Sequence, residues 1–457
     1  MNFLGDFSRW TFDPRKRFTR VLEQQGRARI DADGNEQSAI FLHHLRALAE
    51  DIGGPYFGPM GDTGFRISPV VDNGLLADLT IHPGVYYAHG VRCENRQEAL
   101  RYTGQPGVSA KDLAPWGRYL VYLEAWERHV SYIEDPGIRE VALGGADTAV
   151  RAELAWQVRI RAGWELEFEE TRTLSHQALT RALRDLGRRS VARLAARAGM
   201  DQEPGEDPCE QPAEAGYRGP ENQLYRVEIH RGGDANQATF KWSRDNGLTF
   251  PVARRKGAVL TLANLGRDAR MTLEPADWVE VLDDRSERLV EPPDLVQVVE
   301  VDPERYQVIL DKEPGDNIGS DPALHPRLRR WNHRAGEPEE GGAELQGGAV
   351  RIREGDDETA WIELEDGIGI RFQSPGDEGG PTVYRPGDYW WIPARTATGD
   401  VEWPTAGDGA PAALEPHGVE RFYAPLAIVE RDEGGMVVLR DTRWVLDIPR
   451  RAPDERG

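Results

Sequence analysis

The chain has 457 residues, a formal net charge of −22 and 39% hydrophobic residues. The acidic balance excludes a general nucleic-acid-binding protein, which needs a basic surface, and we expect neither nucleic acid nor an anionic membrane as a partner. The length exceeds one ordinary core, and 49 Gly with 31 Pro favour several domains built of short strands and turns.

The two cysteines, Cys93 and Cys209, are too few for a disulfide framework or a cysteine-based zinc site, and whether they pair is left open. The N-terminus has no apolar segment after a charged start, so we expect no secretory signal and synthesis in the cytoplasm. No apolar run reaches the roughly 18 residues of a spanning helix, so we expect no membrane span.

Residues 1–34 are predicted to form an extended, basic docking arm. Aromatic, arginine and turn residues alternate there without the period of a strand or a helix. Residues 1–30 hold seven Lys or Arg against three Asp or Glu, ahead of an acidic body. Charge steering and aromatic anchors favour docking on another protein, and the alternative is a segment packed on the chain's own core. The predicted contact residues are Phe7, Arg9, Trp10, Phe12, Gln25 and Arg27.

Residues 35–172 are predicted to hold a first helix and a first β domain. The helix covers residues 35–52, with Asn35 as its cap and the Gly-Gly-Pro sequence at 53–55 as its stop. Apolar residues recur at helical spacing at Phe41, Leu45, Leu48 and Ile52. Strand signals follow at residues 119–126, and residues 153–161 and 164–169 are predicted to form a hairpin.

Residues 173–222 are predicted to form an arginine-rich helix and an acidic linker. The helix, at residues 173–198, has a partial leucine stripe and carries six arginines against one aspartate. This basic face is either solvated or a second docking surface for an acidic partner, with Arg188 and Arg189 as its contact residues. Residues 200–222 are rich in Pro, Gly and acids and are predicted to be the linker.

Residues 223–331 and 348–457 are predicted to be a second and a third β domain, separated by an acidic linker at 332–347. Short strands divided by Gly-Gly, Asn-Gly and Pro-Pro turns are typical of a sandwich or a barrel. Residues 332–380 carry 13 Asp or Glu against four Arg, and this block is either a partner for basic segments of a neighbouring subunit or a solvated loop. The predicted fold class is mainly β with two notable helices, as sandwich or barrel units behind an extended arm.

The Lys-Trp-Ser-Arg-Asp-Asn-Gly run at residues 241–247 is the strongest internal contact candidate. Trp242 ends a predicted strand, and the Asp-Asn-Gly sequence predicts a tight turn. Arg244 either pairs with Asp245 or stacks on Trp242. Because a Trp-Arg pair at a loop tip is a common interface anchor, Trp242 and Arg244 are predicted partner-binding residues.

Five stretches of the chain carry a family resemblance. The opening run Gly-Asp-Phe-Ser-Arg to Asn-Glu-Gln at residues 5–37 is joined by residues 126–136, 224–230, 241–247 and 388–395. In this order they resemble an uncharacterised family encoded beside phage-tail-like contractile injection systems. The resemblance implies a structural role near a tail or baseplate, with copies in three-fold or six-fold order, and it supplies no catalytic residues.

A search for chemistry predicts no enzyme and no cofactor. No nucleophile elbow, P-loop, Rossmann glycine run or H-E-x-x-H motif is present. Asp31, Asp33 and Asn35 imitate a calcium loop, but the glycine and the last ligand are misplaced, so a turn explains them better. Cation binding by the acidic loops is left open.

Three functions are therefore considered. The leading hypothesis is a structural subunit of a contractile injection particle, in the baseplate, spike or fibre-attachment region, tied by its arm to other tail subunits and forming a symmetric homo-oligomer. The second is a carbohydrate- or receptor-binding module at the particle tip, for which Trp361 and Trp403 lie near acids. The third is a cell-wall glycan hydrolase, with carboxylates near Glu363 or Glu402.

Overall fold

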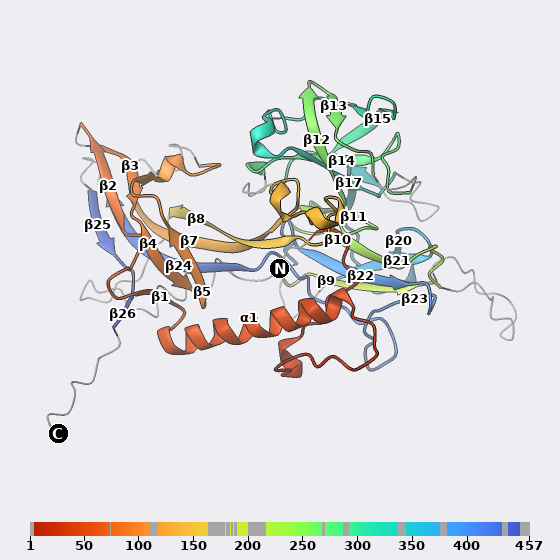
Figure 1. Cartoon of the computed structure of the whole chain (residues 1–457), viewed down its shortest axis with the longest axis horizontal. Coiled ribbons are helices and arrows are strands. Elements are labelled where there is room, and N and C mark those ends of the chain that lie inside the picture. Colours follow the sequence, from red (N-terminus) through yellow and green to blue (C-terminus); the bar gives the residue numbers. More distant parts are fainter. Residues whose placement is uncertain are drawn as a thin grey trace, which may run out of the picture.

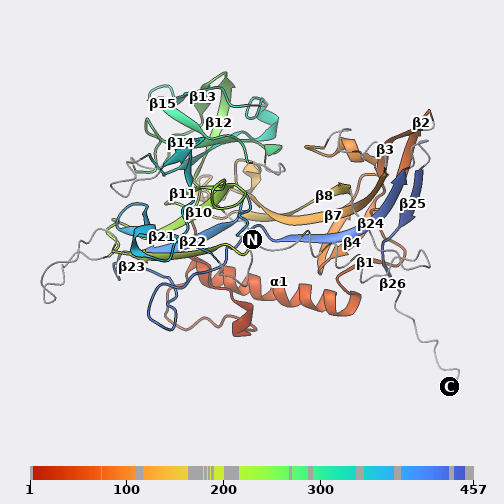
Figure 2. The ribbon, with the colours of Figure 1, turned by 180° about the vertical axis from the view of Figure 1, so that it is seen from behind.

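The computed structural model is mainly β, as the sequence predicts. It describes residues 4–73, 75–108, 113, 117–162, 179, 183, 186, 190–199, 216–266, 270–286, 292–315, 317–335, 344–374, 382–431 and 437–447. The strands gather around three separate apolar cores. Figures 1 and 2 show the arrangement of the strands from opposite sides. Within the described residues, no helix is long and apolar enough to cross a membrane.

The first core lies under a four-stranded sheet of long strands. Its strand order is β25 (Val437–Asp441), β24 (Arg421–Arg431), β7 (Gly117–Val130) and β8 (Arg151–Ala162). A second sheet on this core has the order β26 (Val445–Leu446), β1 (Tyr56–Pro59), β4 (Gly84–Ala88) and β5 (Val91–Asn95). A third sheet is formed by β2 (Ile67–Asp72), β3 (Leu75–Ile81) and β6 (Leu100–Arg101).

The second core is a sandwich of two sheets. Its larger sheet has the order β18 (Leu345–Gln346), β19 (Ala349–Arg351), β11 (Thr239–Ser243), β10 (Gln223–Arg231), β22 (Tyr389–Arg395) and β23 (Asp400–Val401). The smaller sheet is β20 (Ile362–Glu363), β21 (Ile368–Gln373) and β9 (Arg193–Ala198). Apolar side chains of both sheets meet in one cluster, as the alternation of a sandwich strand requires.

The third core fills a closed barrel. Its strands follow the order β12 (Thr249–Lys256), β13 (Val259–Leu262), β16 (Gln307–Leu310), β15 (Val296–Asp302), β14 (Trp278–Leu282) and β17 (Arg327–Trp331). Inward residues such as Leu260, Val279 and Leu328 are fully buried. Because β11 precedes the barrel and β18 follows it, the barrel is an insertion between two strands of one sandwich sheet.

The first predicted helix is present as α1 (Asp31–Gly53). It begins four residues before the predicted cap, so Asn35 lies inside the helix and Ile30 occupies the cap position without a side-chain bond. Ala32, Ala39 and Ile40 are its buried residues. The described residues also contain short 3₁₀ turns: η1 (Pro14–Lys16), η2 (Tyr102–Gly104), η4 (Pro136–Ile138), η5 (Val141–Leu143), η7 (Pro322–Leu324) and η9 (Glu358–Ala360).

The predicted second helix is corrected at its C-terminal end. Residues 193–198 form strand β9, because pairing with β21 places Leu194 and Ala196 in the sandwich core, and that burial outweighs their helix propensity. Leu179, Leu183 and Leu186 are helical and pack against the first core. Arg188 and Arg189 lie outside the described residues, as do most of residues 173–189 and the second half of the predicted hairpin at 163–169.

The C-terminal part of the chain does not form a core of its own. The predicted third domain, residues 348–457, divides between two cores. Strands β20 to β23 belong to the sandwich, whereas β24 pairs with β7 from Arg421 opposite Trp126 to Arg431 opposite Gly117. The chain therefore returns to its first core before it ends, so the sandwich and the barrel lie between two segments of that core in the sequence.

Candidate docking arm and charged junctions

The first part of the N-terminal arm is held on the chain's own sandwich. Gly5 N–H donates to the Asn246 carbonyl at 3.0 Å, and the Asn246 side chain donates back to the Gly5 carbonyl at 3.1 Å. Phe7 and Trp10 pack against an apolar cluster on the outer face of the larger sandwich sheet, and the Trp10 and Trp391 rings lie 6.4 Å apart. We call residues 4–13 the anchor segment.

Polar contacts fix the anchor segment further. Arg9 forms an ion pair of 3.1 Å with Glu402, which also accepts from Arg395 at 2.9 Å. Arg395 donates to the Ser8 carbonyl at 2.6 Å. Phe12 lies 5.7 Å from the ring of His43 on α1. Phe7, Arg9, Trp10 and Phe12 therefore all contact the chain itself, which matches the alternative reading of the arm.

The second part of the arm, residues 17–30, is exposed, and we call it the tip segment. Phe18 is 53% exposed, Leu22 71% and Ile30 42%. Gln25 and Arg27, two predicted contact residues, are also exposed. The segment holds four arginines against one glutamate. Its attachment includes the Val21 N–H, which donates to the Gln37 side chain on α1 at 2.8 Å.

The run at residues 241–247 has a structural position that the sequence did not reveal. Trp242 is 5% exposed and packs in the sandwich core, so it is covered by the chain itself. Arg244 pairs with Glu365 at 2.5 Å instead of Asp245. The predicted tight turn is present, with Asn246 at φ 50° and Gly247 at φ 79°. Asn246 also accepts from the Trp391 indole at 2.8 Å, so this turn and β22 together hold the anchor segment.

A buried cluster of charges joins the sandwich to the barrel. The sandwich contributes Arg226, Glu228 and Lys241, and the barrel contributes Glu280 and Arg329. Arg226 bonds Glu228 at 2.6 Å, Lys241 lies 3.3 Å from Glu228, and Lys241 forms an ion pair with Glu280. Each of these side chains is at most 10% exposed, so the charges compensate one another out of contact with water.

The pKa values of Glu228, and of the nearby buried residues His230 and His333, are shifted at this junction. Burial by itself raises the pKa of Glu228, but Arg226 and Lys241 outweigh it and lower that pKa to about 2. Burial lowers the pKa of His230 to about 2, and Lys241 acts in the same direction. Burial also lowers the pKa of His333 to about 4, although its hydrogen bond of 2.7 Å to the Gly348 carbonyl opposes the change. At neutral pH Glu228 is therefore ionised, and His230 and His333 are uncharged.

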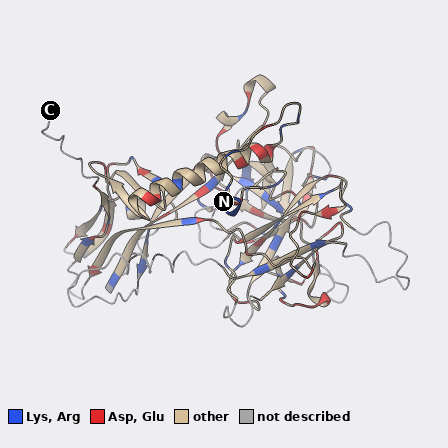
Figure 3. Ribbon diagram, turned by 90° about the horizontal axis from the view of Figure 1, so that it is seen from below, with Lys and Arg blue, Asp and Glu red and all other residues tan. Residues whose placement is uncertain are grey.

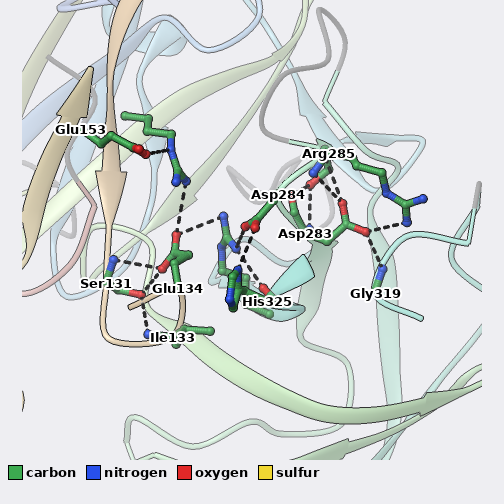
Figure 4. A network of polar contacts seen from close by, with 12 residues as sticks. Ser131, Ile133, Glu134, Glu153, Asp283, Asp284, Arg285, Gly319 and His325 are labelled. Atoms are coloured by element: carbon green, nitrogen blue, oxygen red, sulfur yellow. Dashed lines mark hydrogen bonds and ion pairs between the residues drawn. The ribbon is translucent and has the colours of Figure 1, made fainter. Parts of the chain in front are cut away.

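A second charged network joins the first core to the barrel (Figure 4). Glu134, after β7, accepts from the Ser131 N–H at 2.9 Å and lies 3.4 Å from Arg327 of the barrel. Arg327 also lies 3.5 Å from Asp284, which pairs with His325 at 2.7 Å. Because Glu134 and Arg327 are only 4% and 3% exposed, this contact is a buried clasp between two cores.

Four of the stretches that carried the resemblance contribute residues to these junctions or to the contact with the anchor segment. Glu134 belongs to the second stretch, Arg226 and Glu228 to the third, Lys241 to the fourth, and Trp391 to the fifth. Sequence reasoning missed this role. One signal in the sequence could have indicated these junctions. Charged residues lie within strands rich in aromatic residues, where charged side chains are expected to be buried and paired instead of solvated.

A groove of about 960 Å³ lies between the arm, α1 and the segment before β24, and it is lined in part by Trp10, His43, Asp388 and His417. Burial raises the pKa of Asp388 to about 6 and lowers the pKa of His417 to about 4. In the part of the chain that the structure describes, no three His, Cys, Asp or Glu side chains are grouped to hold a metal.

The residues considered for glycan chemistry lie in structural contacts. Trp361 is 4% exposed, with the guanidinium of Arg197 4.1 Å from its ring centre. Trp403 is half-buried and donates to the Ala412 carbonyl at 2.8 Å. Glu402 is shared by Arg9 and Arg395, whereas Glu363 is exposed on β20.

The fold and its contacts define a mainly β protein with three cores, and the anchor segment of its arm packs on the sandwich that forms the second core. The chain belongs to a family of unknown function, DUF6519, whose model matches residues 3–166 and 168–438. The match takes in the arm, all three cores and both charged junctions. No curated protein and no solved structure matches the chain.

Proposed function

We propose that this protein is a structural subunit of a phage-tail-like contractile injection particle, in its baseplate, spike or fibre-attachment region. Its resemblance to a family encoded beside such particles suggests the setting. The observation that carries a docking role is the tip segment. Three large apolar side chains, Phe18, Leu22 and Ile30, are exposed there among four arginines.

The tip segment has the properties of a preorganised contact. The anchor segment on one side and α1 on the other fix both of its ends, which reduces the entropy lost when a partner binds. Apolar side chains give the contact area, and arginines select an acidic surface. The partner is therefore a neighbouring particle subunit with an acidic, partly apolar patch, and Phe7, Arg9, Trp10 and Phe12 position the tip without contacting that partner.

Co-sedimentation with particles tests this proposal. A lysate of the native host is fractionated by ultracentrifugation, the chain is followed by antibody, and the pellet is examined by negative stain. The parent chain should pellet with tail-like particles, and a Phe18→Ser/Leu22→Ser variant should remain in the supernatant. The matched control is Val141→Ser/Leu143→Ser, because these residues are 85% and 66% exposed on η5, which is not part of the arm.

Two results would contradict the proposal. If the parent chain stays in the supernatant while particles pellet, the chain is not a particle subunit. If it pellets and the tip variant pellets equally, the chain is a subunit that docks through another surface. A melting temperature equal to that of the parent shows that each variant is folded.

A further inference from the structure

The outer face of α1 carries a heptad pattern that no part of the described chain covers. Phe41, Leu45, Leu48 and Ile52 are 62%, 63%, 56% and 59% exposed. Their spacing of four, three and four residues is that of the a and d positions of a coiled coil. We call these four residues the α1 seam.

The seam faces away from the molecule. The residues of α1 that touch the body lie on its opposite side: Ala39 and Ile40 are buried, and Arg46 forms an ion pair of 2.6 Å with Glu127. On a helical wheel with Leu45 at position a, these are positions b and c. Figure 3, viewed from the side of the helix, shows α1 crossing in front of the strands. A second helix therefore has access to the seam.

We propose that the α1 seam binds the α1 seam of a second copy of this chain, with the two helices antiparallel. The spacing of the seam reads the same in both directions, so a two-fold axis places Phe41 beside Ile52 of the other copy and Leu45 beside Leu48. A two-fold contact needs such a self-complementary surface.

The polar residues that flank the seam favour the antiparallel arrangement. His44 and Asp51 both occupy position g, on one flank of the seam, and both are exposed. In an antiparallel pair the g flanks of the two helices meet, so His44 of one copy lies nearest Asp51 of the other, twice per dimer. In a parallel pair each g residue faces position e, where the chain has the apolar residues Leu42 and Ala49, so His44 and Asp51 gain no polar partner.

The contact is expected to be weak in isolation. Three helical turns make a smaller patch than the roughly 800 Å² per partner of a typical stable complex, so the dimer should depend on concentration. The inference goes beyond the particle assignment and does not depend on it, because the purified chain alone is sufficient for the test.

Sedimentation velocity of the purified full chain over a range of concentrations is the experiment. The parent chain should shift from monomer to dimer as concentration rises, and Leu45→Glu/Leu48→Glu should remain monomeric throughout. Val141→Glu/Leu143→Glu, which places the same charges on another exposed apolar site, should dimerise like the parent. The tip variant Phe18→Ser/Leu22→Ser should also dimerise, so loss of particle docking and loss of self-association are distinguished.

A charge exchange tests the orientation. His44→Asp brings a second carboxylate beside Asp51 on each flank and should weaken the dimer roughly fivefold, because like charges then meet twice per dimer. Adding Asp51→Lys to His44→Asp should restore the parent affinity. A parent chain that is monomeric at every concentration overturns the proposal, as does a dimer that persists in Leu45→Glu/Leu48→Glu. A dimer that the second substitution does not restore overturns the antiparallel arrangement.

Discussion

At the scale of single residues, the chain is unusual in placing charges where a β protein normally places apolar side chains. Lys241 is 1% exposed and lies between Glu228 and Glu280, with its ammonium 4.3 Å from the centre of the Trp331 ring. Two carboxylates and an aromatic face replace the water that this ammonium loses. Removing one partner would leave a buried charge without compensation. The charges on the facing surfaces of the sandwich and the barrel are therefore complementary.

The buried histidine of the same junction predicts a loss of stability in mild acid. The pKa of His333 is about 4 in the folded chain against 6.5 as its ordinary value, mainly because of burial. Between these values the unfolded chain binds the proton and the folded chain does not, so this stabilisation is complete above pH 6.5 and is lost as pH falls toward 4. His333→Gln keeps a donor for Gly348 and should reduce the fall in unfolding free energy between pH 7.5 and 4.5 by about 2 kcal/mol.

Urea unfolding at the two pH values measures this difference. His44→Gln, the same substitution on the exposed face of α1, is the control. Because burial lowers the pKa of His230 and His417 in the same direction, some acid dependence should remain in the variant. Equal pH dependence in His333→Gln and the parent would count against the assignment of the loss to this histidine.

At the scale of elements, the arm separates into a part that stabilises the chain and a part that faces outward. Phe7 and Trp10 cover Leu224, Tyr389 and Trp391, whereas the side chains of the tip segment are exposed. Removing the two anchor rings should therefore uncover apolar surface of the sheet, and removing a tip ring should not.

Phe7→Ala/Trp10→Ala is expected to lower the unfolding free energy by about 2 to 4 kcal/mol, since both rings are half-buried. Phe18→Ala, a ring of the same kind in the tip segment, should change it by less than about 0.5 kcal/mol. Urea denaturation followed by tryptophan fluorescence measures both. A loss in Phe18→Ala as large as in the double variant would show that the division between anchor and tip is wrong.

The sequence predicts where helices and strands form better than it predicts which elements pack against them. The spacing from Phe41 to Ile52 is sufficient for a helix, but a period tells which side chains share a face and not which face is covered. The prediction failed at residues 193–198, where an Arg, Leu and Ala composition suits a helix and a buried strand position decides otherwise. The pairing of β24 with β7 joins residues about 300 positions apart, and no local signal encodes such a partner.

The candidate site was predictable in part. Composition singles out the arm, because basic and aromatic residues precede an acidic body. Composition does not distinguish the anchor segment from the tip segment. The anchor segment is the part that packs on the outer face of the sheet, and this face forms only when β10 pairs with β22. Trp242 and Arg244 were found by a turn motif, yet the turn serves the chain's own packing. The buried junctions were missed because each combines strands from different parts of the chain.

At the scale of the whole molecule, the barrel is one continuous insertion that charged contacts fasten to both of its neighbours, and two of these contacts are buried networks. One is the cluster around Lys241 on the sandwich, and the other is the clasp between Glu134 and Arg327 on the first core. The chain crosses from the sandwich to the first core again at β24. The clasp can be tested by a single pair of residues.

A double-mutant cycle of Glu134→Gln and Arg327→Gln should give a coupling energy of about 1 to 3 kcal/mol, because both side chains are nearly buried and their charges lie 3.4 Å apart. The unfolding free energies of the parent, the two single variants and the double variant are measured by urea denaturation. Asp302→Asn and Arg305→Gln form the matched cycle on an exposed ion pair of the barrel, and their coupling should be below about 0.5 kcal/mol. A clasp coupling no larger than this control would mean that the contact between Glu134 and Arg327 does not stabilise the junction between the first core and the barrel.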